Sequence, residues 1–268
     1  MARYIGLVNL GSRLGTVCMQ IDIEPASHRE VQPLRDRYRE EMNCQIVHDS
    51  WHQRGFLQSY RLSLAGRVVG YGSVGGVGDE PKDLVKEFFL EPDDRGASQA
   101  LFRALVAASG AKRIESQTND RLLTLMLLDS VETVERDRIL FEDAVTTSHV
   151  LADARFRPIG PEERDSVFTH EVEPVGDWVI EQEGEIAATG GLTFHYNPPY
   201  SDIYMEVAAP LRGRGLGTFL VQELKRVSHE MGKTPAARCS ASNVASRRTL
   251  QRAGMAPCAW IIGGSIAR

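Results

Sequence analysis

The chain has 268 residues, of which 42% are hydrophobic and 25% are charged, a balance typical of a soluble globular protein. Its length allows one large domain or two of ordinary size. No apolar run approaches the roughly 18 residues that cross a bilayer, and the first 20 residues do not resemble a signal peptide. We therefore expect a cytoplasmic protein without a membrane partner.

Apolar periodicity and glycine-rich turns predict strands and helices in alternation. In the first half we predict a helix over 29–42, a hairpin over 60–74, and strands over 86–92 and 113–118. In the second half we predict a strand over 154–159, a hairpin over 178–192, a strand over 202–207, a helix over 217–231, a strand over 236–241, a helix over 244–252 and a last strand over 258–264. This order indicates a layered α/β fold.

The two halves match each other at a constant offset of 118 residues. Residues 207–224 fall on 89–106 without a gap, and residues 178–192 fall on 60–74. The offset places Pro210 over Pro92 and Gly184 over Gly66. We predict two similar domains in tandem: an N-terminal extension or first strand over 1–20, a first domain over 21–150 and a second over 151–268.

The stretch PLRGRGLGTFLVQELKR (210–226) places three glycines and two arginines before a helix whose predicted apolar stripe is Leu216, Leu220, Leu224, Val227 and Met231. The first turn of a helix offers unpaired backbone N–H groups, and glycines let an anion approach them closely. The spacing fits neither G-x-G-x-x-G nor a P-loop. It does fit R-x-x-G-x-G, with Arg212, Gly215 and Gly217.

The charge distribution points the same way. Between Arg212 and Arg252 there are nine Lys or Arg residues and two acids, a net charge of +7 in a chain whose total is −5. A local positive field in an acidic protein favours one anionic ligand over an extended nucleic-acid surface, so we expect no nucleic-acid partner. The alternative is a solvated basic helix face.

These motifs resemble the GNAT superfamily of CoA-dependent N-acetyltransferases. The strand, glycine turn and helix are followed by a second strand and a helix with Asn243, Ser246, Leu250, Gly254 and Met255. The resemblance covers 151–268, and it reaches 21–150 only through the internal repeat. It implies two GNAT-like domains, each a mixed, mostly antiparallel sheet flanked by helices, with acetyl-CoA as cosubstrate.

The resemblance also implies the cofactor-binding residues. They are Val207, Ala208, Leu211, Arg212, Gly213, Arg214, Gly215, Leu216, Gly217, Thr218, Asn243, Ser246 and Arg247. For Asn243 the alternative, compatible with this role, is a plain helix N-cap. In the first half the offset puts Asp93, Asp94, Ala97 and Gln99 at positions of this loop. Because acids repel a pyrophosphate and side chains crowd it, we predict that the first domain does not bind CoA there.

Acetyl transfer to an amine needs a base, since an alkyl amine with a pKa of about 10 is protonated at pH 7. Alternation along the strand puts Asp202, Tyr204 and Glu206 on one face. Glu206, nearest the loop, is the first choice for the base, and Asp202 is the second; the alternative is a solvent-facing polar edge. Leu250 stands where many family members have a Tyr that protonates the thiolate, so Tyr204, Cys239 or solvent would take that role.

Other features leave choices open. The loop over 194–202, with His195, Tyr196 and Tyr200, is either an acceptor pocket or a rigid hairpin turn. Cys44, His48 and His52 share helical spacing but lack a fourth ligand, so we expect no metal.

The acceptor is expected to be a small-molecule or a peptide or protein amine, and a homodimer is left open. The alternatives to an acetyltransferase are a non-catalytic CoA-sensing or interaction module, or another acyl transfer on this scaffold, including an aminoacyl-tRNA-dependent one.

Overall fold

The computed structural model describes residues 3–12, 15–41, 46–194 and 197–267. Two compact units divide the chain. Unit 1 consists of Met1–Asp137 with Trp260–Arg268, and unit 2 consists of Arg138–Ala259. Within these residues no helix is both long and apolar enough to cross a membrane.

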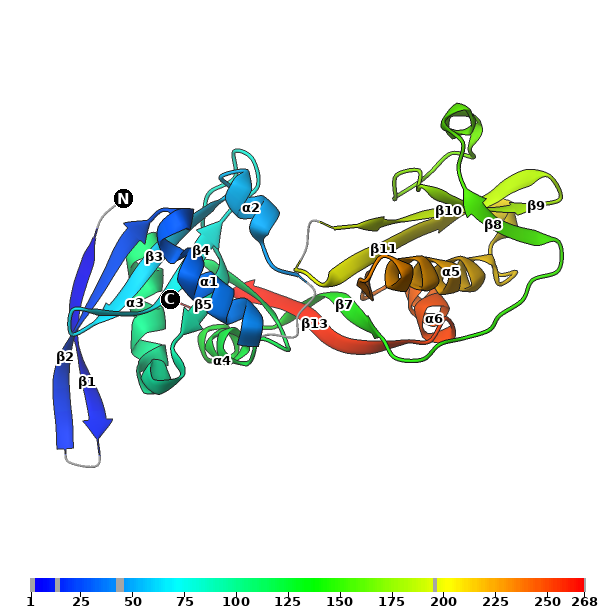
Figure 1. Ribbon diagram of the computed structural model, residues 1–268. Helices are drawn as coiled ribbons and strands as arrows, with labels where there is room; N and C mark the ends of the chain where they lie inside the picture. The colour runs from blue at the N-terminus through cyan, green and yellow to red at the C-terminus, as the bar shows by residue number, and fades with distance from the viewer. Residues whose placement is uncertain (1–2, 13–14, 42–45, 195–196, 268) are drawn as a thin grey trace. The chain divides into compact units, whose positions relative to one another are not determined.

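Unit 1 is a sheet with helices on both faces (Figure 1). Its elements are β1 (Tyr4–Ser12), β2 (Gly15–Ala26), α1 (His28–Glu41), α2 (Asp49–Gln53), β3 (Leu57–Leu64), β4 (Arg67–Gly75), β5 (Leu84–Leu90), the 3-10 helix η1 (Pro92–Ala97), α3 (Ser98–Ser109), β6 (Arg113–Gln117) and α4 (Arg121–Ser130). Consecutive residues of a strand point to opposite faces. Accordingly, Phe88 packs with Leu101 and Leu123 of α3 and α4, whereas Phe89 packs with Leu34 of α1.

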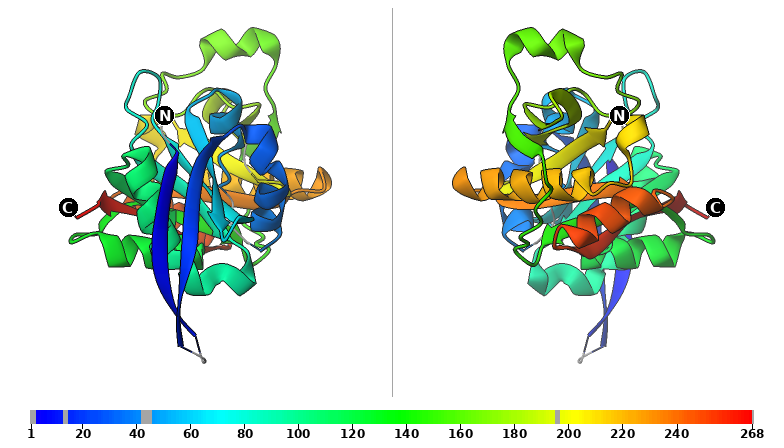
Figure 2. Two further views of the ribbon diagram at one scale, coloured as in Figure 1. Left: turned by 90° about the vertical axis from the view of Figure 1, so that its left-hand side faces the viewer. Right: turned by 90° about the vertical axis from the view of Figure 1, so that its right-hand side faces the viewer.

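The first two strands form a long hairpin. β1 pairs with β2 from Tyr4 to Ser12, whereas β2 pairs with β3 only over Ile21–Ala26. The hairpin therefore projects past the other strands of its unit (Figure 2). Of residues 1–20, expected as an extension or first strand, Tyr4–Ser12 form β1 and residues 15–20 form the first part of β2.

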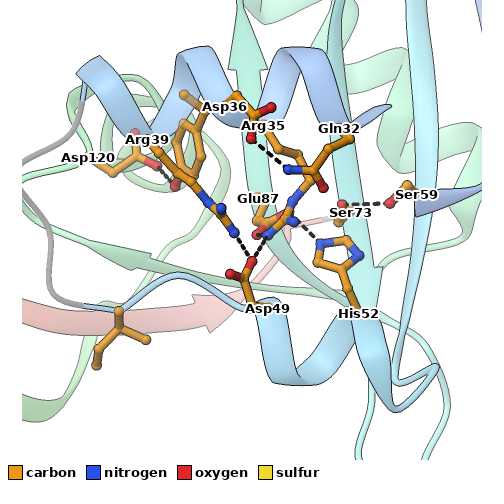
Figure 3. Close-up of polar contacts among 12 residues, drawn as sticks. Gln32, Arg35, Asp36, Arg39, Asp49, His52, Ser59, Ser73, Glu87 and Asp120 are labelled. Carbon is orange, nitrogen blue, oxygen red and sulfur yellow. Dashed lines mark hydrogen bonds and ion pairs between the residues drawn. The ribbon is translucent and has the colours of Figure 1, made fainter. Parts of the chain in front are cut away.

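A buried polar cluster lies between α1, α2 and β5 (Figure 3). The fully buried Arg35 guanidinium contacts Glu87 at 3.1 Å and Asp49 at 2.9 Å, and His52 Nε2 lies 2.8 Å from Glu87. Burial alone would raise the pKa of Glu87, but Arg35 and His52 hold this pKa well below its usual range. The cluster therefore keeps Glu87 ionised inside unit 1.

Unit 2 has the same kind of sheet. Its elements are β7 (Glu135–Asp143, entering from unit 1), β8 (Ala154–Pro158), the 3-10 helix η2 (Pro161–Ser166), β9 (Trp178–Gln182), β10 (Glu185–Thr193), β11 (Tyr200–Val207), the 3-10 helix η3 (Ala209–Leu211), α5 (Leu216–Glu230), β12 (Thr234–Ser240) and α6 (Val244–Arg252). Leu216, Leu220 and Leu224 of the predicted stripe are buried, but Met231 lies past the helix end and is exposed.

The described strand pairings are antiparallel except β5 with β6 and β11 with β12, which confirms the predicted mixed, mostly antiparallel fold class. The offset of 118 residues is also visible in the elements. β4 and β10 begin and end 118 residues apart, and α3 and α5 begin 118 residues apart, at Ser98 and Leu216.

The units divide at other residues than the predicted boundary between 150 and 151. Arg138–Glu142 pair with β12 and so join unit 2, before the predicted start at 151. The last strand, β13 (Met255–Ser265), leaves unit 2 at Ala259, and Ile261–Ser265 pair with β6 of unit 1. The extents 21–150 and 151–268 are therefore corrected, because strand pairing decides which unit a segment completes.

Candidate functional site

Strand β11 of unit 2 loses one neighbour halfway along its length. It pairs with β10 from Asp202 to Val207, but its described pairing with β12 runs only from Tyr200 to Ile203. The two parallel strands therefore separate beyond Ile203. On the side of β12, the backbone N–H and C=O groups of residues 204–207 are therefore available to a ligand or to water, since such groups need hydrogen-bond partners.

The turn after β11 has the backbone that its glycines allow. Gly213 has φ +84° and Gly215 has φ +88°, a left-handed conformation that other residues adopt at a cost of about 1–2 kcal/mol. Helix α5 begins directly after Gly215, so the N–H groups of its first turn face the end of the turn. Arg212 and Arg214 are exposed beside them. This arrangement suits an anion.

Gly217, the last glycine of the motif, serves close packing. A Cβ atom there would lie 3.2 Å from the Thr249 methyl carbon and 3.3 Å from the Met205 methyl carbon. The first turn of α5 therefore packs closely against β11 and α6. Thr218 is buried, whereas the preceding Leu211 is half-buried on η3.

Arg212 is held by groups of unit 2. Its Nε donates to the Val207 carbonyl at 3.1 Å, and its Nη2 lies 3.1 Å from Glu171 and 3.7 Å from Glu206. Arg212 thus connects the turn to the end of β11 and to the β8–β9 loop. Ala208, which follows β11, donates its N–H to Ala187 and is buried.

Helix α6 begins as the sequence predicts. Asn243 is its N-cap, and Asn243 Oδ1 accepts the Ser246 N–H at 2.9 Å, so the N-cap interpretation is confirmed. Arg247 is exposed one residue further on. Leu250 is buried in the same helix, where it packs as an apolar residue. A contact of Asn243, Ser246 or Arg247 with a cofactor stays a prediction.

The predicted polar face of β11 exists, but its members differ. Glu206, the first choice for the base, is buried and accepts three backbone N–H groups, from Glu171 at 2.7 Å, Val172 at 3.2 Å and Glu173 at 3.1 Å. Burial would raise the pKa of Glu206, but these hydrogen bonds outweigh it and lower the pKa. Such a carboxylate is a weak base.

Asp202, the second choice, is a better base. Burial raises the pKa of Asp202 to about 6, and Glu173 adds to the increase; Arg238 Nε, 3.1 Å away, and Arg138 oppose it. Asp202 also lies where β11 and β12 separate. Between the two acids is Tyr204, whose pKa burial raises and whose ring lies over Gly191.

Sequence reasoning missed the β8–β9 loop. His170 Nδ1 donates to the Glu173 carbonyl at 2.8 Å, and its Nε2 lies 3.2 Å from Thr189 Oγ1 on β10. No periodicity marks this loop in the sequence. The side chains that hold it lie on β10 and β11, further along the chain. The glycine at position 176, just before β9, was the available signal, since glycine permits close backbone approach. A Cβ on Gly176 would lie 2.0 Å from the Gly190 carbonyl oxygen.

Other expectations fall elsewhere. His195 and Tyr196 of the suggested acceptor loop lie outside the described residues, and Tyr200 begins β11 as a half-buried residue. Cys44 also lies outside them. His48 and His52 flank or belong to α2, where His52 binds Glu87, and no metal-ligand cluster occurs among the described residues.

Comparison with known proteins shows which family the sequence matches. Residues 145–255 match the model of the acetyltransferase (GNAT) family. A solved acetyltransferase from the GNAT family of Colwellia psychrerythraea is similar over 91% of this chain and 99% of its own, with a TM-score of 0.72 and 15% identity. A tandem GNAT protein from the clavulanic acid biosynthesis pathway, solved without AcCoA, is similar over 92% and 99%, with a TM-score of 0.59 and 14% identity. The curated proteins contain no match.

Proposed function

From the premise that this chain belongs to the GNAT superfamily, through residues 145–255, we propose that unit 2 transfers an acetyl group from acetyl-CoA to a primary amine. The observation that carries the proposal is the junction of β11 and α5. There a turn with two left-handed glycines opens onto a helix start, beside a strand edge that β12 leaves unpaired. The acceptor is an amine of a small molecule or of a peptide or protein.

The proposed cofactor site follows from these elements. The pyrophosphate of CoA would bind the backbone N–H groups of the turn and of the first turn of α5, near Arg212 and Arg214. The pantetheine arm would lie along the edge of residues 204–207, as an extra strand would. From Val207 back to Ile203 the strand rises about 13 Å, at about 3.3 Å per residue. The thioester would then come to lie near Asp202.

The proposed reaction is direct attack in a ternary complex. The amine nitrogen forms a bond to the thioester carbonyl carbon, the C–S bond breaks, and the sulfur leaves as a thiolate that takes up the proton lost by the new amide nitrogen. Asp202 is proposed to accept the proton that the ammonium group loses, because a carboxylate with a pKa near 6 is ionised at pH 7 and still basic. A backbone N–H group at the end of this edge nearest Asp202 would face the developing oxyanion.

The test combines binding with turnover. Isothermal titration with acetyl-CoA should show micromolar binding, and a thiol reagent should detect CoA release with at least one member of an amine panel. The acid limb of kcat/KM near pH 6 should disappear in Asp202→Asn. Acetyl-CoA binding without CoA release for any amine would instead favour a non-catalytic CoA-binding module, and absence of binding would reject both.

A further inference from the structure

We infer that Glu206 is a positioning residue, which shapes residues 170–173 of the β8–β9 loop into a wall on the acceptor side of the site. This role deepens the proposed acyl transfer and rests on it. Glu206 lies on the same face of β11 as Asp202 and Tyr204, and the loop covers that face. The opposite face carries Met205, which packs against α5.

The carboxylate of Glu206 organises three consecutive backbone groups. Glu206 Oε1 accepts the N–H of Glu171, and Oε2 accepts those of Val172 and Glu173. Glu206 is only 8% exposed, so its oxygens are directed at the loop and not at a solvent-filled groove. Hydrogen bonds to an ionised acceptor are roughly twice as strong as those between neutral groups, so three of them hold a short turn in one conformation.

A second contact fixes the same loop to β10. Since the Glu173 carbonyl can only accept, His170 Nδ1 carries the proton, and in the neutral ring Nε2 accepts from the Thr189 hydroxyl. Thr189 Oγ1 in turn accepts the Gly176 N–H at 3.3 Å. Phe168 stacks on His170 with ring centroids 4.8 Å apart. The loop is therefore attached to two adjacent strands, at Thr189 and at its cross-strand neighbour Glu206.

Arg212 links this wall to the cofactor turn. Its guanidinium lies between Glu171 on the loop and Glu206 on the strand, while Nε holds the Val207 carbonyl. The same arginine belongs to the R-x-x-G-x-G motif. The acceptor wall and the turn thus share one side chain, which places the acceptor relative to the bound thioester.

The roles of the two acids can be separated by hydrogen exchange and kinetics on the full chain. In Glu206→Gln, one amide oxygen replaces two carboxylate oxygens, so peptides covering 168–176 should exchange about tenfold faster. The acceptor KM should rise about tenfold while kcat changes less than threefold and the acid limb near pH 6 stays. In Asp202→Asn, exchange of 168–176 should match the wild type while kcat falls and the limb disappears. Glu230→Gln, an exposed acid on α5, is the matched control and should change neither.

Thr189→Val provides a second variant, because it removes the His170 contact without altering β11. It should also speed exchange of 168–176. Wild-type exchange of 168–176 in Glu206→Gln would overturn the inference, whatever Thr189→Val shows, as would loss of the acid limb in Glu206→Gln. If the wild type releases no CoA with any amine, the proposed function fails, and the exchange measurement alone decides whether Glu206 shapes the loop.

Discussion

The turn before α3 and the turn before α5 occupy the same place in their units but have opposite chemistry. Before α5, Gly213 and Gly215 adopt left-handed backbone and Arg212 and Arg214 are exposed. Before α3, the residue 118 positions before Arg212 is Asp94, which is buried and bound by Arg67 through two hydrogen bonds of 2.6 and 3.0 Å. Arg212 is also paired, with Glu171 and Glu206, but it stays exposed beside Arg214, so the second turn presents N–H groups and positive charge. The first turn instead carries the buried carboxylate of Asp94 in its ion pair with Arg67.

The helix that follows in each unit shows the same contrast. The N-cap of α6, Asn243, is exposed, and its side chain accepts a hydrogen bond from Ser246 of the same helix. The N-cap of α4, Asp120, is buried and accepts the Tyr38 hydroxyl at 2.8 Å, so α1 reaches the start of α4. A common fold therefore supplies a turn and a helix start. Whether they can take an anion depends on backbone conformation, local charge and what covers them, and these support the prediction that unit 1 binds no CoA there.

The largest effect should come from removing the segment that completes unit 1. A chain ending at Ala259 loses the pairing of Ile261–Ser265 with β6, whose described pairing with β5 covers only Leu84 and Val85. Unit 1 should lose its cooperative unfolding transition while CoA binding by unit 2 persists, as followed by calorimetry and titration. A chain ending at Ser265 is the control. An intact unit 1 transition in the shorter chain would contradict the assignment of these residues.

The next effect concerns the polar cluster of unit 1. Arg35→Met leaves the ionised Glu87 without its main partner, and breaking a buried pair in this way costs about 3–5 kcal/mol in unfolding free energy. Replacing both residues, as Arg35→Met with Glu87→Leu, should recover most of that loss. Urea unfolding measures both, with exposed Arg103→Met as control. A loss below 1 kcal/mol for Arg35→Met would show that the cluster does not stabilise unit 1.

A smaller effect distinguishes the two turns directly. Gly215→Val forces a branched side chain into left-handed backbone and should weaken acetyl-CoA binding at least tenfold, about 1.4 kcal/mol. The matched variant is Gly96→Val in the turn of unit 1, where φ is not positive and no atom lies within 4 Å of a new Cβ. It should leave the affinity unchanged. Equal losses in the two variants would refute the assignment of CoA to the second turn.

An effect of similar size, but dependent on pH, concerns Asp120, the N-cap of α4 in unit 1. Burial raises the pKa of Asp120 to about 6, against its hydrogen bonds with Leu123 and Tyr38, so the folded state binds the proton more tightly than the unfolded chain. The contribution of Asp120 to stability should therefore improve as the pH falls from 7 to 4, by at most about 3 kcal/mol. At pH 7.5 the unfolding free energy of Asp120→Asn should be about 1–2 kcal/mol higher than that of the wild type. Removing the buried charge stabilises the fold, and a lost hydrogen bond offsets part of this stabilisation.

The measurement for Asp120 is urea unfolding at pH 4.5 and 7.5, with exposed Asp93→Asn as the reference. The difference between Asp120→Asn and the wild type should shrink at the lower pH. A difference that is the same at both values would mean that Asp120 titrates normally.

Local patterns predicted much of this molecule, and non-local pairing explains the rest. Helix α6 spans 244–252 as predicted, because Asn243 and Gly254 mark its ends. Alternation along β11 correctly placed Asp202 and Glu206 on one face. It could not show that Glu206 is bound by backbone groups 33–35 residues earlier, since those N–H groups belong to a loop without periodicity. The sequence likewise predicted a strand over 258–264, but it did not show that this strand pairs with β6 of unit 1.

The last strand has a consequence for the order of events during synthesis. Ile262 pairs with Ser116, so β6 must wait for a partner that the ribosome adds 146 residues later. Until residues 261–265 emerge, the edge of β6 stays exposed, and an open strand edge invites pairing with other chains. The N-terminal unit is translated first but completed last, so a chaperone that covers β6 would matter most while unit 2 is being made.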